Sequence, residues 1–192
     1  TDDSLAILQE YATKDARVKI LDKPNSGYGA SMNLGLSYAT GEYIGIVESD
    51  DWVETNMFEK LYQLAVTHQA DIVKSDFYYY WSVPQEKNCK ANALPSSLLG
   101  QLIQPRSQQL IFEVMPSIWS AVYKRSFIEK KHIRFLETPG ASYQDTSFNF
   151  LVLALAERMY ITNDAFVHYR QDNMQSSVNS RGKVFCVCDE WH

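Results

Sequence analysis

The sequence predicts an α/β fold, in which an open, mostly parallel sheet is flanked by helices. Helical and strand-like stretches alternate along residues 1–81, which is the sequence form of a sheet with right-handed crossovers. A short apolar run at 43–47 contains the β-branched residues expected of a buried strand. That run ends in clustered acids, and open α/β sheets place their ligands at the carboxyl ends of such strands.

The individual elements follow from the spacing of apolar residues. In the first half, helices are expected over 1–12, 30–39 and 56–68, and strands over 17–22, 43–47 and 72–81. In the second half, helices are expected over 107–114, 125–132 and 146–157, and strands over 118–123, 158–161 and 165–169. Turns are expected at 24–27 and 138–141, where proline and glycine occur together.

Length and composition limit the class of protein. The chain has 192 residues, enough for one domain with a sizeable core, and a formal net charge of -5. A mildly acidic chain without a basic stripe argues against nucleic acid as a partner. The longest apolar run, 150–156, is too short to span a bilayer. Three cysteines without a disulfide framework favour a reducing compartment, with Cys186 and Cys188 as free thiols.

The acids after the strand at 43–47 are the most informative cluster. Glu48, Asp50 and Asp51 place three carboxylates within four positions. Such a cluster repels itself unless a cation, hydrogen-bond donors or solvent stabilise the ionised forms. Oxygen ligands of this kind suit magnesium or manganese. A solvated acidic turn before the next helix explains the same residues, and the cluster alone does not decide between the two interpretations.

Several short motifs follow one another in an order known from one family. The first half contains Asp2-Asp3-Ser4-Leu5, Asn25-x-Gly27, Asn33-x-Gly35, Gly41-Glu42-Tyr43-Ile44 and Glu48-Ser49-Asp50-Asp51. The second half contains Tyr123-Lys124-Arg125-Ser126-Phe127, Tyr143-Gln144-Asp145-Thr146 and Tyr169-Arg170 followed by Ser176-Ser177. Together these motifs cover nearly the whole chain and resemble glycosyltransferase family 2, the nucleotide-sugar transferases with a GT-A fold.

The resemblance implies a role for each motif. Asp50 and Asp51 would bind a magnesium or manganese ion that bridges the diphosphate of the donor, and Asp145 would be the general base. The implied nucleotide-sugar contacts are Glu48, Asn25, Gly27, Asn33 and Arg170, and the implied acceptor contact is Trp119. From the residues alone, Asp145 is better explained as the N-cap of the helix at 146–157, and core packing is the default explanation for Trp119.

The resemblance also divides the chain. It implies a GT-A-like (Rossmann-like) sheet that is incomplete at the N-terminus, because family members begin with a further strand, helix and strand. Residues 1–81 would form the nucleotide-sugar-binding half and 107–171 the acceptor half, with a loop or insertion at 82–106. Residues 172–192 would be a flexible tail that leads to a missing C-terminal part. Glu48 departs from the family, which usually has Asp at that position.

The implied activity is inverting, metal-dependent transfer of a sugar from a nucleoside diphosphate donor to a glycan or lipid-linked acceptor. A cytoplasmic protein of polysaccharide biosynthesis at the cell envelope is expected, with peripheral association with the inner face of the membrane as an option. An exposed sheet edge would favour self-association. Two alternative functions remain open. One is a metal-dependent nucleotidyltransferase, and the other is a non-catalytic nucleotide-sugar-binding or scaffold domain.

Overall fold

The computed structural model describes residues 2–138, 143–173 and 186–190. The α-helices are α1 (Ser4–Lys14), α2 (Tyr28–Tyr38), α3 (Met57–His68), α4 (Arg125–Lys130), α5 (Gln144–Leu155) and α6 (Cys186–Asp189). The strands are β1 (Tyr43–Gly45), β2 (Trp52–Val53), β3 (Ile72–Trp81), β4 (Lys87–Lys90), β5 (Gln101–Ile103), β6 (Ala121–Lys124) and β7 (Met159–Arg170). Short 3-10 helices lie at Ser96–Leu98, Pro105–Ser107, Gln109–Glu113 and Ile118–Ser120. This alternation of helices and strands confirms the predicted α/β class.

The sheet has the order β1-β6-β3-β7-β2, with β4 added beside β3 and β5 beside β7. The mostly parallel pairing was predicted wrongly, since β3 and β7 form the parallel pair and the other described pairs are antiparallel. The predicted crossover itself is present. Because β1 and β3 are each antiparallel to β6, they run in the same direction, and a strand from the second half is inserted between them.

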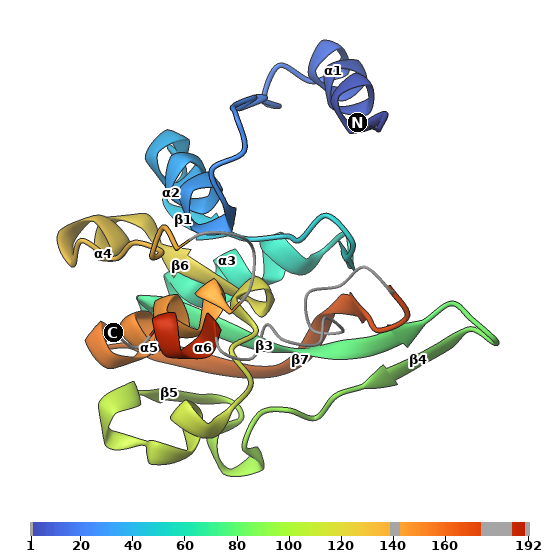
Figure 1. The fold of residues 1–192 in the computed structure, drawn as a ribbon. Coiled ribbons are helices and arrows are strands. Elements are labelled where there is room, and N and C mark those ends of the chain that lie inside the picture. Colours follow the sequence, from blue (N-terminus) through green and yellow to red (C-terminus); the bar gives the residue numbers. More distant parts are fainter. Residues whose placement is uncertain (1, 139–142, 174–185, 191–192) are drawn as a thin grey trace.

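Helices α3 and α5 cover opposite faces of the sheet (Figure 1). Successive side chains of a strand point to opposite faces, and β6 shows both. Val122 borders a groove with Phe58 and Tyr62 of α3, whereas the ring of Tyr123 contacts Phe148 of α5 edge-on at 5.6 Å. The core therefore lies in two layers, one on each side of β3.

The expected strand at 17–22 is wrong. Residues 15–27 form no strand in the structure, and most of the side chains at 17–22 are exposed. Helix α1 buries none of its residues, and it stands clear of the body together with the segment that follows it (Figure 1). Alternating apolar residues supply one face for a strand, but a strand also needs a partner for its backbone hydrogen bonds, and no described strand lies beside this segment.

The segment at 82–106, expected to be a loop or insertion, contains two strands. These are β4 and β5, which pair antiparallel with β3 and β7. Leu94, Leu98 and Ile103 are buried and fasten the segment to the core. The sequence pattern does not reveal these three buried residues, because polar residues and prolines surround them and they are spaced too widely to give a periodic pattern.

The expected flexible tail at 172–192 is partly outside the described residues, as is the turn at 138–141. Residues 186–190 are described, and there α6 lies against α5 (Figure 1) with Glu190 buried. The two short strands expected at 158–161 and 165–169 form the single strand β7, whose register against β3 shifts near Asp76.

The exposed edge of β1 predicts self-association at high concentration. In the described sheet β1 pairs only with β6, and a groove beside it is lined by Tyr43, Phe58 and Tyr62. Phe58 and Tyr62 are 41% and 47% exposed. Unpaired edges and contiguous apolar surface promote association. We expect Tyr62→Lys to lower the average mass measured by light scattering.

Val83→Lys is the control for that experiment. Val83 is 64% exposed but precedes β4, away from the groove. It should leave the average mass as it is in the wild type. A strictly monomeric mass for the wild-type chain at high concentration would contradict the prediction.

Candidate active site

The acids at the carboxyl end of β1 turn toward α2 and β7. Tyr28, the first residue of α2, donates a hydrogen bond from its hydroxyl to Glu48 Oε1 at 2.5 Å. Burial raises the pKa of the Glu48 carboxyl, the hydrogen bond from Tyr28 lowers it, and the charge of Asp50 raises it further. Because glutamate is one methylene longer than the aspartate usual in the family, its carboxylate can reach this hydroxyl.

Helix α2 is held close to the segment at 133–137. A Cβ at Gly29 would lie 1.9 Å from the carbonyl oxygen of Leu136, so only glycine fits there. Asn33 donates from Nδ2 to the carbonyl of Phe135 and to Glu137 Oε1, both at 2.9 Å, and its Oδ1 accepts from the Phe135 amide. The structure does not support Asn33 as a nucleotide-sugar contact, because its amide clasps two segments together and thereby positions the start of α2.

Asp51 and Asp50 are tied to the end of β7. The backbone amide of Arg170 donates to Asp51 Oδ1 at 2.9 Å, and Asn173 Nδ2 donates to Asp50 Oδ2 at 2.9 Å. Asp51 Oδ2 is buried and has no hydrogen-bond partner among the described residues. Burial raises the pKa of the Asp51 carboxyl to about 6, with the Arg170 amide opposing it and the charges of Asp50 and Glu48 adding to it. The charge of Arg170 also opposes the rise, and the site contains a buried carboxylate oxygen without a hydrogen-bond donor among the described residues.

Asp145 lies in the first turn of α5. Tyr143 is the N-cap residue, and Asp145 is the second residue of the helix, so the alternative interpretation of Asp145 as the N-cap is wrong. Burial raises the pKa of its carboxyl to about 6. The amides of Asp145 and Thr146 oppose this shift, whereas the charges of Glu48 and Glu190 add to it. A carboxylate with this pKa is ionised at neutral pH and is still basic enough to accept a proton.

Electrostatic coupling brings these three elements into one site. Burial raises the pKa of the Tyr169 hydroxyl to about 12, and the charges of Asp51, Asp50 and Asp145 raise it further. Charges act appreciably only over short distances. The carboxylates of Asp50, Asp51 and Asp145 therefore lie within electrostatic range of the Tyr169 side chain at the end of β7.

Arg170 and Trp52 form the side of the site next to β2. The Arg170 guanidinium carbon lies 6.0 Å from the centroid of the Trp52 ring, and its Nε lies 3.8 Å from Asp172 Oδ1. Trp52 is 37% exposed and stacks on His168 with ring centroids 5.1 Å apart. A hydrogen bond with Glu54 Oε1 at 3.0 Å also holds the His168 ring in place.

The remaining predicted residues lie further from the acids or are buried. Asn25 Oδ1 accepts from the Gly27 amide at 3.1 Å, and Gly27 has a φ of 89° before α2 begins, so both fit a plain turn. Trp119 is 6% exposed, and its ring lies against Phe77 at 4.8 Å and Tyr169 at 5.0 Å. The structure does not support Trp119 as an acceptor contact, because core packing buries the ring beneath Tyr169.

Sequence reasoning did not identify Tyr28, Tyr169 or Glu190 as residues of the site. The Tyr169-Arg170 motif contains Tyr169, but the motif does not indicate what this residue does. Tyr28 could be found only from its place after Gly27 at the start of a helix. For Glu190 no local signal exists, because its partners lie 43 or more positions away.

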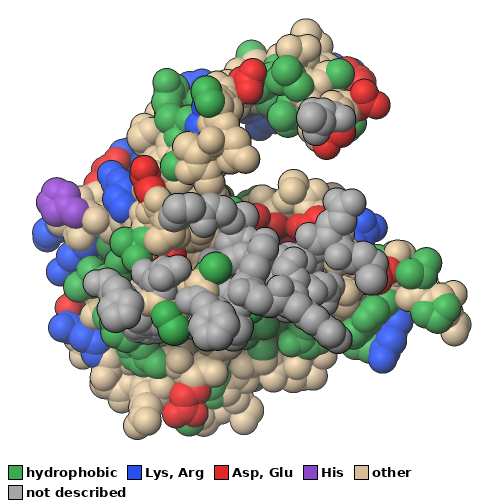
Figure 2. Space-filling model, in the orientation of Figure 1, with side chains coloured by type: hydrophobic (Ala, Val, Ile, Leu, Met, Phe, Trp, Pro, Cys, Tyr) green, Lys and Arg blue, Asp and Glu red, His purple; other side chains and the backbone are tan. Residues whose placement is uncertain are grey.

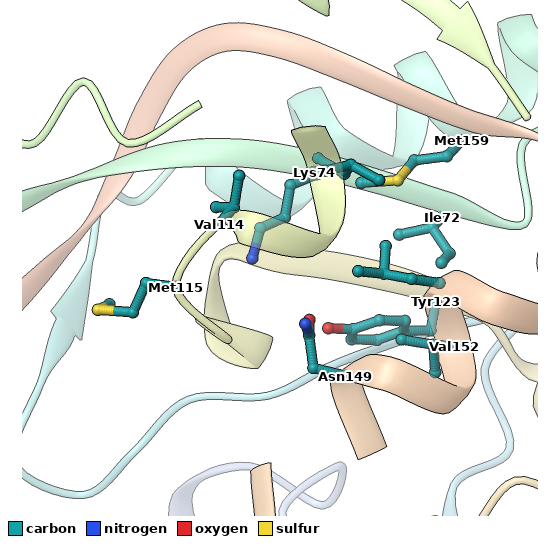
Figure 3. A pocket seen from close by; sticks show the side chains of 10 residues that line it. Ile72, Lys74, Val114, Met115, Tyr123, Asn149, Val152 and Met159 are labelled. Atoms are coloured by element: carbon teal, nitrogen blue, oxygen red, sulfur yellow. The ribbon is translucent and has the colours of Figure 1, made fainter. Parts of the chain in front are cut away.

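A small, partly open cavity lies beneath α5 and is lined by residues of α5, β3 and β6. Lys74 of β3 reaches into it, with Asn149 of α5 and Tyr123 pointing into the same space (Figure 3). The Lys74 ammonium donates to the Ser117 carbonyl and, at 2.8 Å, to Ser117 Oγ. Burial lowers its pKa to about 7. The cavity leaves about 10 Å³ for the centre of a water molecule, which is room for about one water.

The oxygen atoms at this site fit a divalent cation that is bound partly by the protein and partly by a substrate. Among residues 2–138, 143–173 and 186–190, no three His, Cys, Asp or Glu side chains form a ready metal cage. Magnesium is usually held by one or two carboxylates together with substrate phosphates. The buried, unpartnered Oδ2 of Asp51 is an oxygen of this kind, and Asp50 is its neighbour. Acidic side chains are exposed on the body across the gap from α1 (Figure 2).

None of the helices in the described part of the chain is both long enough and apolar enough to traverse a bilayer.

Comparisons with known proteins agree on one family. The model of the family described as Glycosyl transferase family 2 matches residues 1–135. EpsJ of Bacillus subtilis, named an uncharacterized glycosyltransferase, is 30% identical over 176 residues, which are 89% of this chain and 50% of the relative. The cholesterol galactosyltransferase of Borreliella burgdorferi is 30% identical over 190 residues, which are 93% of this chain and 52% of the relative.

The fold agrees as well. The crystal structure of S. aureus TarS 1–349 in complex with UDP-GlcNAc has a TM-score of 0.75 at 18% identity, covering 99% of this chain and 52% of that one. The chain spans about half the length of the relatives it matches. The family model matches residues 1–135, which are well over half of this chain. The chain therefore belongs to glycosyltransferase family 2.

Proposed function

We propose that the full-length protein transfers a sugar, with inversion, from a nucleoside diphosphate donor to a glycan or lipid-linked acceptor. The observation that carries this proposal is that Asp145 on α5 and the acids Asp50 and Asp51 after β1 all lie within electrostatic range of the Tyr169 hydroxyl, and that Glu48 acts on Asp145. A solved structure of this fold is titled as a complex with UDP-GlcNAc, which supports a uridine-linked donor. Polysaccharide synthesis on the cytoplasmic face of the cell envelope is the setting that we infer.

In this mechanism the donor diphosphate lies beside Asp50 and Asp51. A magnesium or manganese ion held by these two carboxylates would neutralise the leaving diphosphate as a Lewis acid. Glu48, fixed by the hydroxyl of Tyr28, would face the ribose or the sugar of the donor. Arg170 would contact the diphosphate from the end of β7, while Trp52 offers the partly exposed ring nearest to it for stacking on a sugar.

Asp145 would act on the acceptor. Its carboxylate takes the proton of an acceptor hydroxyl as the hydroxyl oxygen attacks the anomeric carbon of the donor sugar. The bond between that carbon and the phosphate oxygen breaks, and the nucleoside diphosphate leaves with the electron pair. One base and a displacement from the opposite face produce inversion, so no second nucleophilic carboxylate is required.

Product analysis tests the reaction class. We expect the full-length protein, given UDP-sugars and magnesium or manganese, to release a nucleoside diphosphate in step with sugar transfer. Release of pyrophosphate when UTP and a sugar 1-phosphate are supplied instead, with formation of the UDP-sugar, would indicate a nucleotidyltransferase. Binding of UDP and manganese in calorimetry, without turnover on any glycan or lipid-linked acceptor, would indicate a binding or scaffold domain.

A further inference from the structure

Glu190 is a buried acid that the proposed chemistry does not use. It follows α6, and its side chain is 4% exposed. Its Oε1 accepts a hydrogen bond from Thr138 Oγ1 at 2.8 Å, and its Oε2 accepts one from Ser147 Oγ at 2.5 Å. A carboxylate is costly to bury unless its oxygens are hydrogen-bonded, and both oxygens of Glu190 are.

These two hydrogen bonds clasp the start of α5. Ser147 lies in the first turn of the helix, and Thr138 precedes it in the chain. Gln144, the first residue of α5, donates from Nε2 to Thr138 Oγ1 at 3.0 Å, which closes the cluster. Asp145 lies between Gln144 and Ser147 in this turn. The orientation of the Asp145 carboxylate therefore depends on a turn that Glu190 holds from outside.

Glu190 also contributes charge. Acidic groups from two elements face Asp145, namely Glu48 after β1 and Glu190 after α6, and both raise the pKa of its carboxyl. The ammonium of Lys74 is coupled to Asp145 from β3. The neutral hydroxyls coupled to Asp145 belong to Tyr28, Tyr123 and Tyr169. Glu190 is the one acid of this set that comes from the C-terminal part of the described chain.

We propose that Glu190 is a positioning residue for Asp145, because its hydrogen bonds to Thr138 and Ser147 fix the first turn of α5. The inference rests on the proposed function, in which Asp145 is the general base. It makes the docking of the C-terminal segment a condition for full activity, although Glu190 itself touches no substrate.

The test is the pH profile of kcat for the full-length protein with Glu190→Gln. Glutamine keeps the size of the side chain and removes the charge, so the Asp145 carboxyl should lose its proton at a lower pH. We expect the acidic limb of the profile to move down by about half a pH unit. We also expect kcat at neutral pH to fall by about tenfold because the base is weaker and less well held, with KM for the donor unchanged.

Two further variants separate charge from anchoring. Ser147→Ala removes one hydrogen bond and keeps the charge, so kcat should fall while the acidic limb stays in place. If Glu190→Gln fails to fold, Glu190→Asp is measured in its place. Aspartate retains the charge on a shorter side chain, so kcat should fall while the acidic limb stays in place, as for Ser147→Ala. Glu129→Gln, at an exposed acid of α4, is the matched control and should leave the profile unchanged.

An unmoved acidic limb and unchanged kcat in Glu190→Gln, with only a lower melting temperature, would overturn the inference and leave Glu190 a structural residue. This failure is distinct from failure of the proposed function. If Asp145→Asn abolishes transfer while Glu190→Gln behaves as the wild type, only the role of Glu190 is wrong. If Asp145→Asn transfers sugar at the wild-type rate, the proposed function itself is wrong.

Discussion

Replacing Asp145 with asparagine in the full-length protein is expected to lower kcat by about a hundredfold to ten-thousandfold, the range that a positioned base contributes. The dissociation constant of the nucleotide-sugar should stay within about twofold of the wild-type value. In the proposed mechanism Asp145 acts on the acceptor, so its replacement removes no interaction that binds the donor. Single-turnover transfer and donor calorimetry on the same preparation measure the two quantities. Asp164→Asn, at an exposed acid of β7, is the matched control.

The pH dependence of this variant sharpens the prediction. Burial raises the pKa of the Asp145 carboxyl to about 6, and the base must be ionised to accept a proton. Wild-type kcat should therefore be full well above pH 6 and be lost as the pH falls through about 6. In Asp145→Asn this limb should vanish together with most of the rate. Wild-type transfer by the variant at pH 7 would remove Asp145 from the mechanism.

Asp145→Asn should also stabilise the fold. Because the folded-state pKa is raised from 3.8 to about 6, the folded protein binds more protons than the unfolded chain between these values, and stability falls as the pH rises through that window. At pH 7 the ionised carboxylate costs up to about 3 kcal/mol, counting roughly 1.4 kcal/mol per pKa unit. Chemical denaturation at pH 7 should show a gain in the free energy of unfolding, together with the lost activity.

Replacing Asp51 or Asp50 with asparagine is expected to lower turnover with magnesium or manganese by about a hundredfold or more. A metal ion contributes several kcal/mol to neutralising a developing charge, and each 1.36 kcal/mol is a factor of ten. In Asp51→Asn the amide oxygen can still accept from the Arg170 amide, so the fold should persist. An NH2 group then replaces the unpartnered Oδ2, and a cation cannot bind to it.

Calorimetry with UDP and manganese measures the binding part of this effect. Asp50→Asn keeps an amide oxygen for the hydrogen bond from Asn173, so both variants preserve the described contacts and remove one charge each. The variant with the larger loss of manganese-dependent UDP binding identifies the stronger ligand. If both variants kept wild-type donor turnover in magnesium, the assignment of the metal to these aspartates would be wrong. Asp164→Asn again serves as the control.

The residues changed in these experiments differ in how readily the sequence alone predicts them. Asp50 and Asp51 could be found directly, because an apolar β-branched run followed by acids is a local pattern. Strand β1 begins where that pattern places it, although it ends at Gly45 and is not buried as predicted. The helix α3 and the strand β3 follow from local periodicity in the same way, and β3 spans the predicted Ile72–Trp81. Asp145 could be assigned to catalysis only through the family motif, since its local pattern favoured an N-cap.

The sequence by itself determined the family and the main helices and strands of residues 28–81, together with α4 and α5, because apolar periodicity and short motifs are local properties of the chain. The tertiary structure decided which strands lie side by side, with β6 inserted between β1 and β3. It also decided that Tyr28 holds Glu48 and that Glu190 clasps the turn carrying Asp145. These contacts join residues 20 and 43 positions apart, and they exist only because packing of the whole core brings distant segments together.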